Sequence, residues 1–146
     1  MPTYTVTTTA NHLTPRQKTR IAQDITRIHK SVTGAPAVFV QVVFADIDPA
    51  NHFIAGKPLL HDFIFLQGHI RAGRSPEQKH DLLHQLVVAL AEAAAFPKNA
   101  VWAYLSELPA NQMIEFGHTL PQPGTEAEWL NALPPEDRNL MDRIGR

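Results

Sequence analysis

The chain has 146 residues, which is enough for one domain with its own hydrophobic core but too few for two independent domains. A net charge of −1 without any basic run excludes an electrostatic attraction to nucleic acid or to acidic membranes. Because the chain contains no cysteine, disulfide and thiolate chemistry are excluded. Its apolar runs are too short to span a bilayer.

The chain begins with Met1-Pro2, followed by the β-like run Thr3–Thr7. Residues 1–4 have neither a basic nor an apolar region, so no secretory signal is expected and we predict a soluble, cytoplasmic protein. Methionine removal works well before a small residue and would leave Pro2 with a free secondary amine. An α-amino group titrates near ~7.7–8.0 and can exchange protons at neutral pH. Pro2 is therefore either an ordinary second residue or a catalytic one.

A segment of the chain occurs twice, with an offset of 61 residues between Thr14 and Ser75. In each copy a Ser or Thr N-cap is followed by proline and then by glutamine three residues after the cap, which is typical of a helix N-terminus. Apolar residues then recur at helical spacing, at Ile21, Ile25, Ile28 and Val32 and at Leu82, Leu83, Leu86, Val87 and Leu90. The sequence therefore predicts two equivalent helices.

A β-branched or aromatic run flanks each predicted helix on both sides, at residues 2–8 and 38–44 and at residues 63–66 and 101–105. A helical crossover of this length favours a parallel strand pair. Two such β-α-β repeats predict an α/β domain with a four-stranded sheet and both helices on one face. The opposite face of the sheet would be apolar, so we expect it to be covered by oligomerisation.

The rest of the chain is predicted to belong to the same single domain, residues 1–146. Repeat one covers about residues 2–45, and repeat two covers about residues 63–106. Asp46–His61 between them contains Pro49, Gly56 and Pro58 and is interpreted as an irregular linker. In the tail, residues 107–146, the Pro/Gly-rich segment 120–124 precedes an acidic short helix near 126–133 and a second helix after Pro134.

The positions at which the two copies differ are candidates for function. His29 corresponds to Leu90 on the apolar side of its helix, where a histidine is either a core residue or a ligand-binding one. Arg71 and Arg74 fall in the predicted turn before the second helix. They are either solvated turn residues or a fork that binds a small carboxylate, with help from the helix N-terminus.

Four further residues have side chains that could take part in chemistry. Tyr104, in the last predicted strand, is either a packing aromatic or a functional one. Glu115 lies between apolar neighbours, which indicates partial burial and a raised pKa, or else it is a simple loop carboxylate. His80 and His84 have the spacing of two metal ligands on a helix, but no third ligand is evident and no metal site is predicted.

With these residues identified, the chain resembles the tautomerase superfamily and, more narrowly, the cis-3-chloroacrylic acid dehalogenase group. The similarity runs from Pro2 to about Leu133 and includes the segments 69–75, 108–113 and 120–124. The resemblance assigns catalytic roles to Pro2, Tyr104 and Glu115 and carboxylate-binding roles to His29, Arg71 and Arg74. It also implies a homotrimer that uses no cofactor. The loop Thr33–Pro36 departs from the efficient dehalogenase, because Ala35 replaces a hydroxyl residue, and this leaves the substrate open.

The activity that the resemblance implies is hydration of 3-substituted acrylates or propynoate, including dehalogenation of cis-3-haloacrylate to malonate semialdehyde, with Pro2 as general acid. The alternative is keto–enol tautomerisation of a small 2-oxo acid, with Pro2 as general base. Nearby arginines would lower the pKa of Pro2 and Glu115 would raise it, so both remain open. A water-activating pair would be superfluous in a simple tautomerase, which favours hydration. A third interpretation is a trimeric binding protein with vestigial activity.

Overall fold

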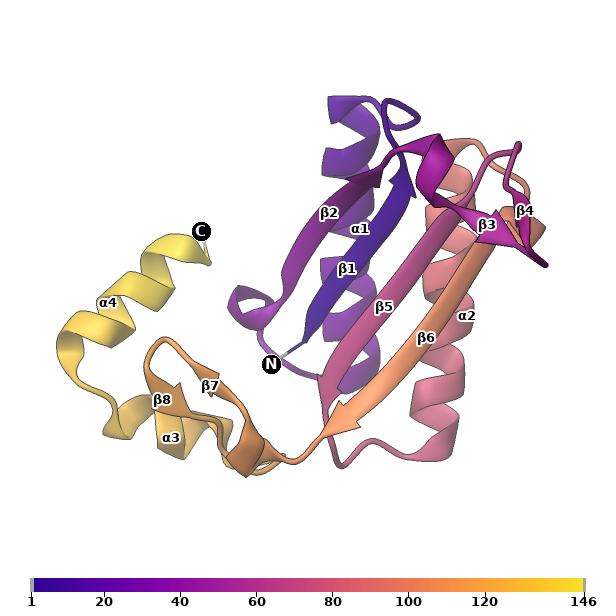
Figure 1. The fold of residues 1–146 in the computed structure, drawn as a ribbon. Coiled ribbons are helices and arrows are strands. Elements are labelled where there is room, and N and C mark those ends of the chain that lie inside the picture. Colours follow the sequence, from indigo (N-terminus) through magenta and orange to yellow (C-terminus); the bar gives the residue numbers. More distant parts are fainter. Residues whose placement is uncertain (1, 146) are drawn as a thin grey trace.

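The computed structural model describes residues 2–145, and Figure 1 shows how their helices and strands are arranged. The body consists of β1 (Thr3–Thr9), α1 (Pro15–Thr33) and β2 (Gln41–Ile47), followed by β5 (Ile64–Arg71), α2 (Pro76–Ala94) and β6 (Val101–Leu108). A hairpin follows each of these units, first β3 (Phe53–Ile54) with β4 (Lys57–Pro58), then β7 (Ile114–Glu115) with β8 (His118–Thr119). The tail helices are α3 (Glu126–Ala132) and α4 (Pro135–Ile144). Short 3-10 helices lie at Ala37–Phe39, Pro49–Asn51, Lys98–Ala100 and Ala110–Gln112.

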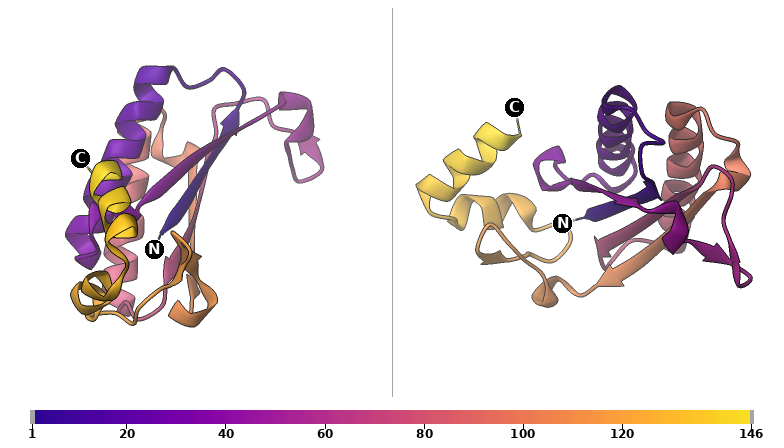
Figure 2. Two further views of the ribbon diagram at one scale, coloured as in Figure 1. Left: turned by 90° about the vertical axis from the view of Figure 1, so that its left-hand side faces the viewer. Right: turned by 45° about the horizontal axis from the view of Figure 1, so that its top comes forward.

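The main sheet has the strand order β2-β1-β5-β6. Each β-α-β unit contributes a parallel pair, β1 with β2 and β5 with β6, and the two units meet where β1 runs antiparallel to β5. Both long helices cover the same face of the sheet (Figure 2, right). The predicted four-stranded α/β sheet with its helices on one face is therefore confirmed.

The first-turn glutamines of the two long helices explain why both copies have the same start. Gln17 completes a capping box with Thr14, and Gln78 does so with Ser75. The side-chain amide of Gln17 also donates to the carbonyl of Ala94 at 2.9 Å, near the end of α2, and that of Gln78 donates to Val32 at 3.2 Å, near the end of α1. Each helix start is thereby bonded to the end of the other helix.

The core lies between the sheet and the two helices. On β1, the side chains of Tyr4, Val6 and Thr8 alternate toward the helices and are fully buried. Burying one large aliphatic side chain completely contributes roughly 1.5–3 kcal/mol, so the periodic residues of both repeats account for much of the stability. The fully buried aliphatic residues include Ile21, Ile25, Ile64, Leu66, Leu82, Leu86 and Leu90.

The interpretation of residues 46–61 as an irregular linker is wrong. β2 continues to Ile47, and β3 and β4 then form a hairpin that lies 61 residues before β7 and β8. The turns match as well, because Ala55-Gly56 and Phe116-Gly117 all have positive φ, the left-handed backbone that a two-residue hairpin requires. The duplication thus includes the hairpins, although their sequences have diverged.

The tail forms a second, smaller core at one end of the sheet. Ala35 and Phe39, from the loop after α1, pack with tail residues Met113, Leu120, Leu133 and Met141. The two short helices predicted in the tail are confirmed as α3 and α4. They lie beyond the start of β1 (Figure 1), so the tail covers the end of the sheet at which the chain begins.

The sheet face opposite the long helices is here called the open face, and it includes Val43, Phe65, Trp102 and Tyr104. Val43, Trp102 and Tyr104 are 43%, 45% and 56% exposed. Phe63 and Phe65 form edge contacts with Trp102 and Tyr104, so the exposed aromatics are one continuous surface. Within residues 2–145, no helix combines the length and the apolar character needed to cross a membrane.

Candidate active site

Pro2 is buried at the start of β1, where the tail covers the end of the sheet. Its carbonyl accepts a hydrogen bond from the backbone N–H of Gln41 at 3.0 Å, which continues the pairing of β1 with β2. Because side chains alternate along a strand, Pro2 lies on the same side as Tyr4, toward the helices. The sheet therefore fixes the position of the first strand up to Pro2.

His29 is 3% exposed, in the last turns of α1, and its Nδ1 lies 2.8 Å from the hydroxyl of Tyr4. Burial, together with the positive charge of Arg74, lowers the pKa of His29 to about 4, so the ring is neutral at pH 7. Burial also raises the pKa of the Tyr4 hydroxyl. When this hydroxyl donates to Nδ1, the ring proton remains on Nε2, where it can be donated to an anionic ligand.

The depressed pKa of His29 predicts a loss of stability in acid. The unfolded histidine binds a proton near pH 6.5 and the folded one only near pH 4, so the free energy of unfolding falls as the pH drops through this range. We expect His29 to account for about 3 kcal/mol of the decrease. Urea unfolding near pH 7 and near pH 4 should show a weaker pH dependence in His29→Gln, but not in the control His84→Gln. Equal pH dependence in wild type and His29→Gln would contradict this.

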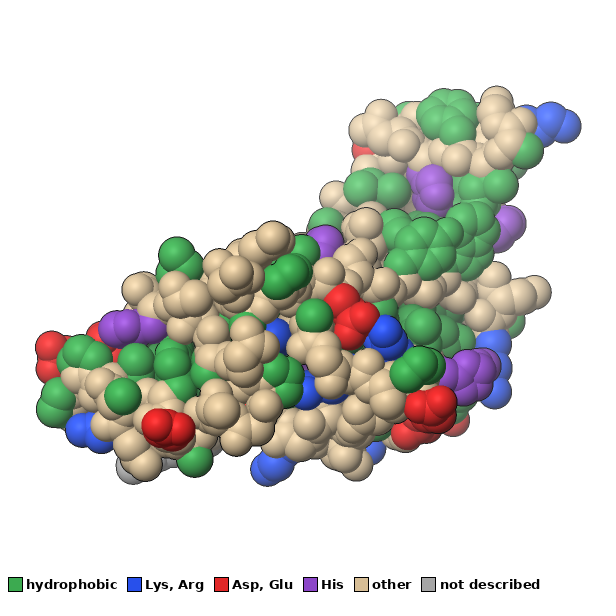
Figure 3. Space-filling model, turned by 90° about the horizontal axis from the view of Figure 1, so that it is seen from below, with side chains coloured by type: hydrophobic (Ala, Val, Ile, Leu, Met, Phe, Trp, Pro, Cys, Tyr) green, Lys and Arg blue, Asp and Glu red, His purple; other side chains and the backbone are tan. Residues whose placement is uncertain are grey.

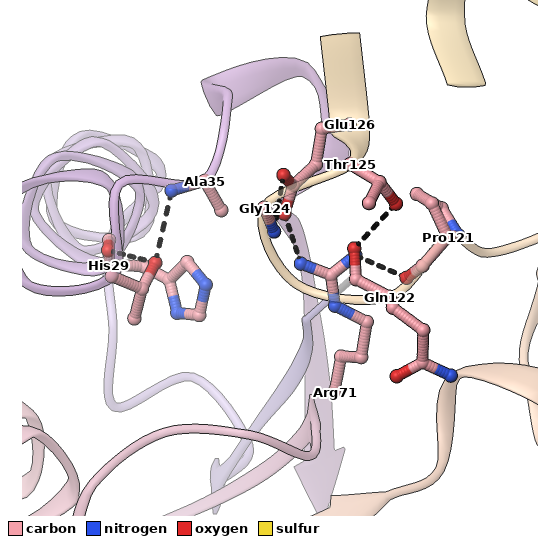
Figure 4. Close-up of polar contacts among 9 residues, drawn as sticks. His29, Ala35, Arg71, Pro121, Gln122, Gly124, Thr125 and Glu126 are labelled. Atoms are coloured by element: carbon pink, nitrogen blue, oxygen red, sulfur yellow. Dashed lines mark hydrogen bonds and ion pairs between the residues drawn. The ribbon is translucent and has the colours of Figure 1, made fainter. Parts of the chain in front are cut away.

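Arg71 was expected in a turn, but it is the last residue of β5. It is 2% exposed, because the tail folds over it. Its Nη1 donates to the carbonyl of Pro121 at 2.6 Å, and its Nη2 forms an ion pair with Glu126 (Figure 4). The strand was predicted at residues 63–66, but β5 continues to Arg71 because its pairing with β6 extends to this end, where the backbone N–H of Ala72 still bonds to the carbonyl of Leu108.

Arg74 follows Arg71 in the loop before α2 and is partly buried. Burial lowers its pKa, the charge of Arg71 lowers it further, and Glu126 and Glu107 act in the opposite direction. Since Arg74 also lowers the pKa of His29, these three basic side chains share one electrostatic environment. Figure 3, which views the molecule from below, shows Lys or Arg side chains next to Asp or Glu side chains in the middle of this face.

Glu115 is partly buried in β7, as predicted, and it lines a cavity of about 810 Å³. Thr3, Gln41 and His69 line the same cavity, and they are paired side by side at the start of β1. The cavity therefore lies at the start of β1, next to Pro2 along the chain, but on the side of Thr3, which faces away from the long helices. Phe39 and Met113 give it an apolar wall, so it can hold the carbon chain of a small acid.

Tyr104 does not join the other site residues within this protomer. It lies on the open face, 56% exposed, with its ring 4.9 Å from that of Phe65. The chain alone thus brings Pro2, His29, Arg71 and Arg74 to one end of the sheet and places Glu115 at the adjoining cavity.

Two residues at the site were not found from the sequence. Tyr4 could have been recognised, because it lies two residues after Pro2 on the face that turns toward the helix carrying His29. Glu126 had no such signal, because it is separated from Arg71 by 55 residues. His80 and His84 have rings 4.2 Å apart and are exposed, and within residues 2–145 no group of three or more His, Cys, Asp or Glu could hold a metal.

A sheet of two β-α-β units, with a proline at its start and basic side chains around it, defines a protein of the tautomerase type. The family model described as "Putative oxalocrotonate tautomerase enzyme" matches residues 1–132. The solved structure of N1, a member of the cis-3-chloroacrylic acid dehalogenase family, is 33% identical with a TM-score of 0.92, over 97% of this chain and 99% of that one. The chain therefore belongs to the tautomerase superfamily, and within it to the cis-3-chloroacrylic acid dehalogenase-like group.

Other solved structures agree with this assignment. Native Ps01740 is 32% identical with a TM-score of 0.73, over 77% of this chain and 99% of that one. An asymmetric trimer of fused 4-OT is 22% identical with a TM-score of 0.73, over 80% of this chain and 94% of that one, and shares the fold. No curated protein sequence matches the chain. Members of the superfamily are enzymes, and the chain has a catalytic function of the tautomerase type.

Proposed function

We propose that the protein hydrates 3-substituted acrylates or propynoate without a cofactor, including the hydrolytic dehalogenation of cis-3-haloacrylate. The observation on which this depends is the gathering of His29, Arg71 and Arg74 at the end of the sheet that also holds Pro2. A cationic site of this kind suits a small carboxylate. The similarity to N1 over 97% of the chain supports the same class of reaction.

In the proposed mechanism, Arg74, Arg71 and His29 bind the substrate carboxylate and withdraw electron density, so that C3 becomes electrophilic. Glu115, helped by Tyr104, removes a proton from a water molecule as its oxygen bonds to C3. The arginines stabilise the enediolate-like charge that develops. Protonated Pro2, exposed by removal of Met1, then donates its proton to C2.

The products follow from the substituent at C3. With a halide at C3, the adduct carries a hydroxyl and a halide on the same carbon, and loss of HX gives malonate semialdehyde. With propynoate, addition of water gives an enol that tautomerises to the same product. Ala35 is buried against the tail, and its side chain has no hydroxyl, whereas the resemblance implies a hydroxyl residue at this position in the efficient dehalogenase.

We also propose that three copies assemble through their open faces. The cluster of Phe65, Trp102 and Tyr104 on the β5–β6 side of this face supports the proposal, because exposed aromatic clusters mark interfaces. The centre of the face is more polar than predicted, since β1 contributes Thr5 and Thr7. The fused 4-OT proteins of the same fold are described as trimers. Assembly would bring Tyr104 to a neighbouring subunit's site, as its role in water activation requires. Sedimentation equilibrium should give a mass of three chains, and a monomer at working concentrations would contradict the proposal.

The second candidate is a keto–enol tautomerase in which neutral Pro2 is the base. The burial of Pro2 and the arginines nearby favour this alternative, since both lower the pKa of an amine. The carboxylates of Glu115 and Glu126 act in the opposite direction. The protonation state of Pro2 therefore distinguishes the two reactions.

An NMR titration of the Pro2 nitrogen in Met1-free protein measures this state directly. We expect a pKa above ~8, because a general acid must hold its proton at neutral pH. Protein that retains Met1 has an amide at this position and is the control that shows no titration. A pKa of roughly 6 to 7 would make Pro2 a neutral base and would assign the tautomerase reaction instead.

A further inference from the structure

We propose that Glu126 is a positioning residue for Arg71: together with the Pro121 carbonyl it holds the guanidinium so that Nε–H, whose nitrogen has no hydrogen-bond partner, is available to the substrate carboxylate. This inference rests on the proposed binding of a carboxylate by Arg71. It concerns a residue of the tail, 55 positions away from the arginine along the chain.

The hydrogen bonds of the Arg71 guanidinium show which of its nitrogens contact the tail and which does not. Nη1 donates to Pro121 and Nη2 to Glu126, so both terminal nitrogens are bonded to the tail. Nε is buried and has no hydrogen-bond partner. An unpartnered buried N–H destabilises the protein, because it has given up its hydrogen bond to water, and a ligand that accepts from it removes this penalty on binding. In Figure 4, Glu126 and Pro121 approach Arg71 from the tail, while His29 lies on the other side.

Glu126 is itself held rigidly. One carboxylate oxygen pairs with Arg71, and the other accepts the backbone N–H of Gly124 at 2.9 Å. Its pKa is lowered by the hydrogen bond and the charge of Arg71, in spite of partial burial, so the group is ionised at neutral pH. A glutamine has one acceptor oxygen and cannot satisfy both donors, which makes Glu126→Gln a specific disruption of this arrangement.

A second contact joins the same part of the tail to the arginine loop, residues 71–74. Gly73 has a φ of +109°, and a Cβ added there would lie 2.8 Å from Cγ of Pro123. The loop therefore packs directly on the tail between the two residues that bond Arg71. Because the tail fixes both the loop backbone and the guanidinium, it presets the geometry of the carboxylate site, which is how preorganisation strengthens binding.

The competing interpretation is that Glu126 is an internal competitor that a substrate carboxylate must displace. The two interpretations predict opposite changes in affinity. Loss of a positioning group weakens carboxylate binding, whereas loss of a competitor strengthens it.

Propanoate is a suitable probe, because it has the carboxylate but no multiple bond to react, and propanamide is its neutral analogue. Dissociation constants can be measured by chemical-shift titration of the full Met1-free protein. We expect Glu126→Gln to weaken propanoate binding about tenfold, while Glu128→Gln, an exposed neighbour on α3, leaves it unchanged. In an Arg71→Ala background, Glu126→Gln should cause no further loss, which a general structural effect would not reproduce.

Arg71→Lys gives a second measurement that leaves Glu126 in place. The three N–H donors of a lysine diverge from one nitrogen and do not have the spread of a guanidinium fork, so they cannot reach both tail groups and the substrate in the same geometry. We therefore expect a loss of at least about tenfold in propanoate affinity. Tighter binding in Glu126→Gln, additive losses with Arg71→Ala, wild-type affinity in Arg71→Lys, or no preference for propanoate over propanamide would each overturn the inference. Propanoate binding that depends on Glu126 without any turnover of 3-haloacrylates would uphold it and reject only the proposed reaction.

Discussion

Pro2→Ala is expected to lower kcat/KM for hydration of cis-3-chloroacrylate or propynoate by about 10²–10⁴-fold, the usual contribution of a positioned general acid. Alanine keeps an α-amine after methionine removal, but it loses the ring that fixes the nitrogen relative to β1. The proton donor would then occupy many orientations in place of one, and proton transfer to C2 would become slow. Steady-state kinetics on Met1-free protein measures this effect.

Two controls separate chemistry from folding in this experiment. The assembly and thermal stability of Pro2→Ala should match those of wild type, because Pro2 pairs with Gln41 through its backbone carbonyl, which alanine retains. Wild-type chain that retains Met1 keeps the ring but converts the amine to an amide, and it should be as inactive as Pro2→Ala. Wild-type kcat/KM in either protein would show that the Pro2 amine takes no part in the reaction.

Most of the sheet could be predicted from the sequence because its determinants are local. Matching caps at Thr14 and Ser75 and apolar periodicity mark the helices, and the offset of 61 shows that the second unit repeats the first. The hairpins escaped prediction because their strands are two residues long and their turns use Ala55 and Phe116, residues that rarely adopt positive φ. The duplication was recognisable where the helix caps and the buried apolar positions had been preserved.

A site residue could be predicted from the sequence where it differs from the corresponding residue in the other copy of the repeat. His29 stands where the other copy has a core leucine, so its difference was visible without a structure. Arg71 was predicted in the turn before the second helix but ends β5, and its burial depends on the tail, whose contacts arise from tertiary packing. The separation of Tyr104 from the rest of the site could not be predicted either, since the face on which a strand residue lies depends on register.

Glu115→Gln should distinguish hydration from tautomerisation more sharply than any other substitution. The variant keeps the size of the side chain but has no basic oxygen to accept a proton from water. We therefore expect hydration to fall by about 10²–10⁴-fold. Tautomerisation of phenylpyruvate needs only Pro2 and the carboxylate-binding residues, and it should change by less than about threefold, well below the contribution of a general base.

Both activities must be measured on the same preparation, with Glu136→Gln, an exposed carboxylate on α4, as the matched control. Glu115 lies on the hairpin that lines the cavity beside Thr3, so a change in the cavity itself would impair both reactions together. A selective loss of hydration therefore assigns water activation to Glu115. An equal loss of both activities would mean that Glu115 shapes the site or sets the protonation of Pro2, and the proposal of a dedicated water-activating residue would then have to be abandoned.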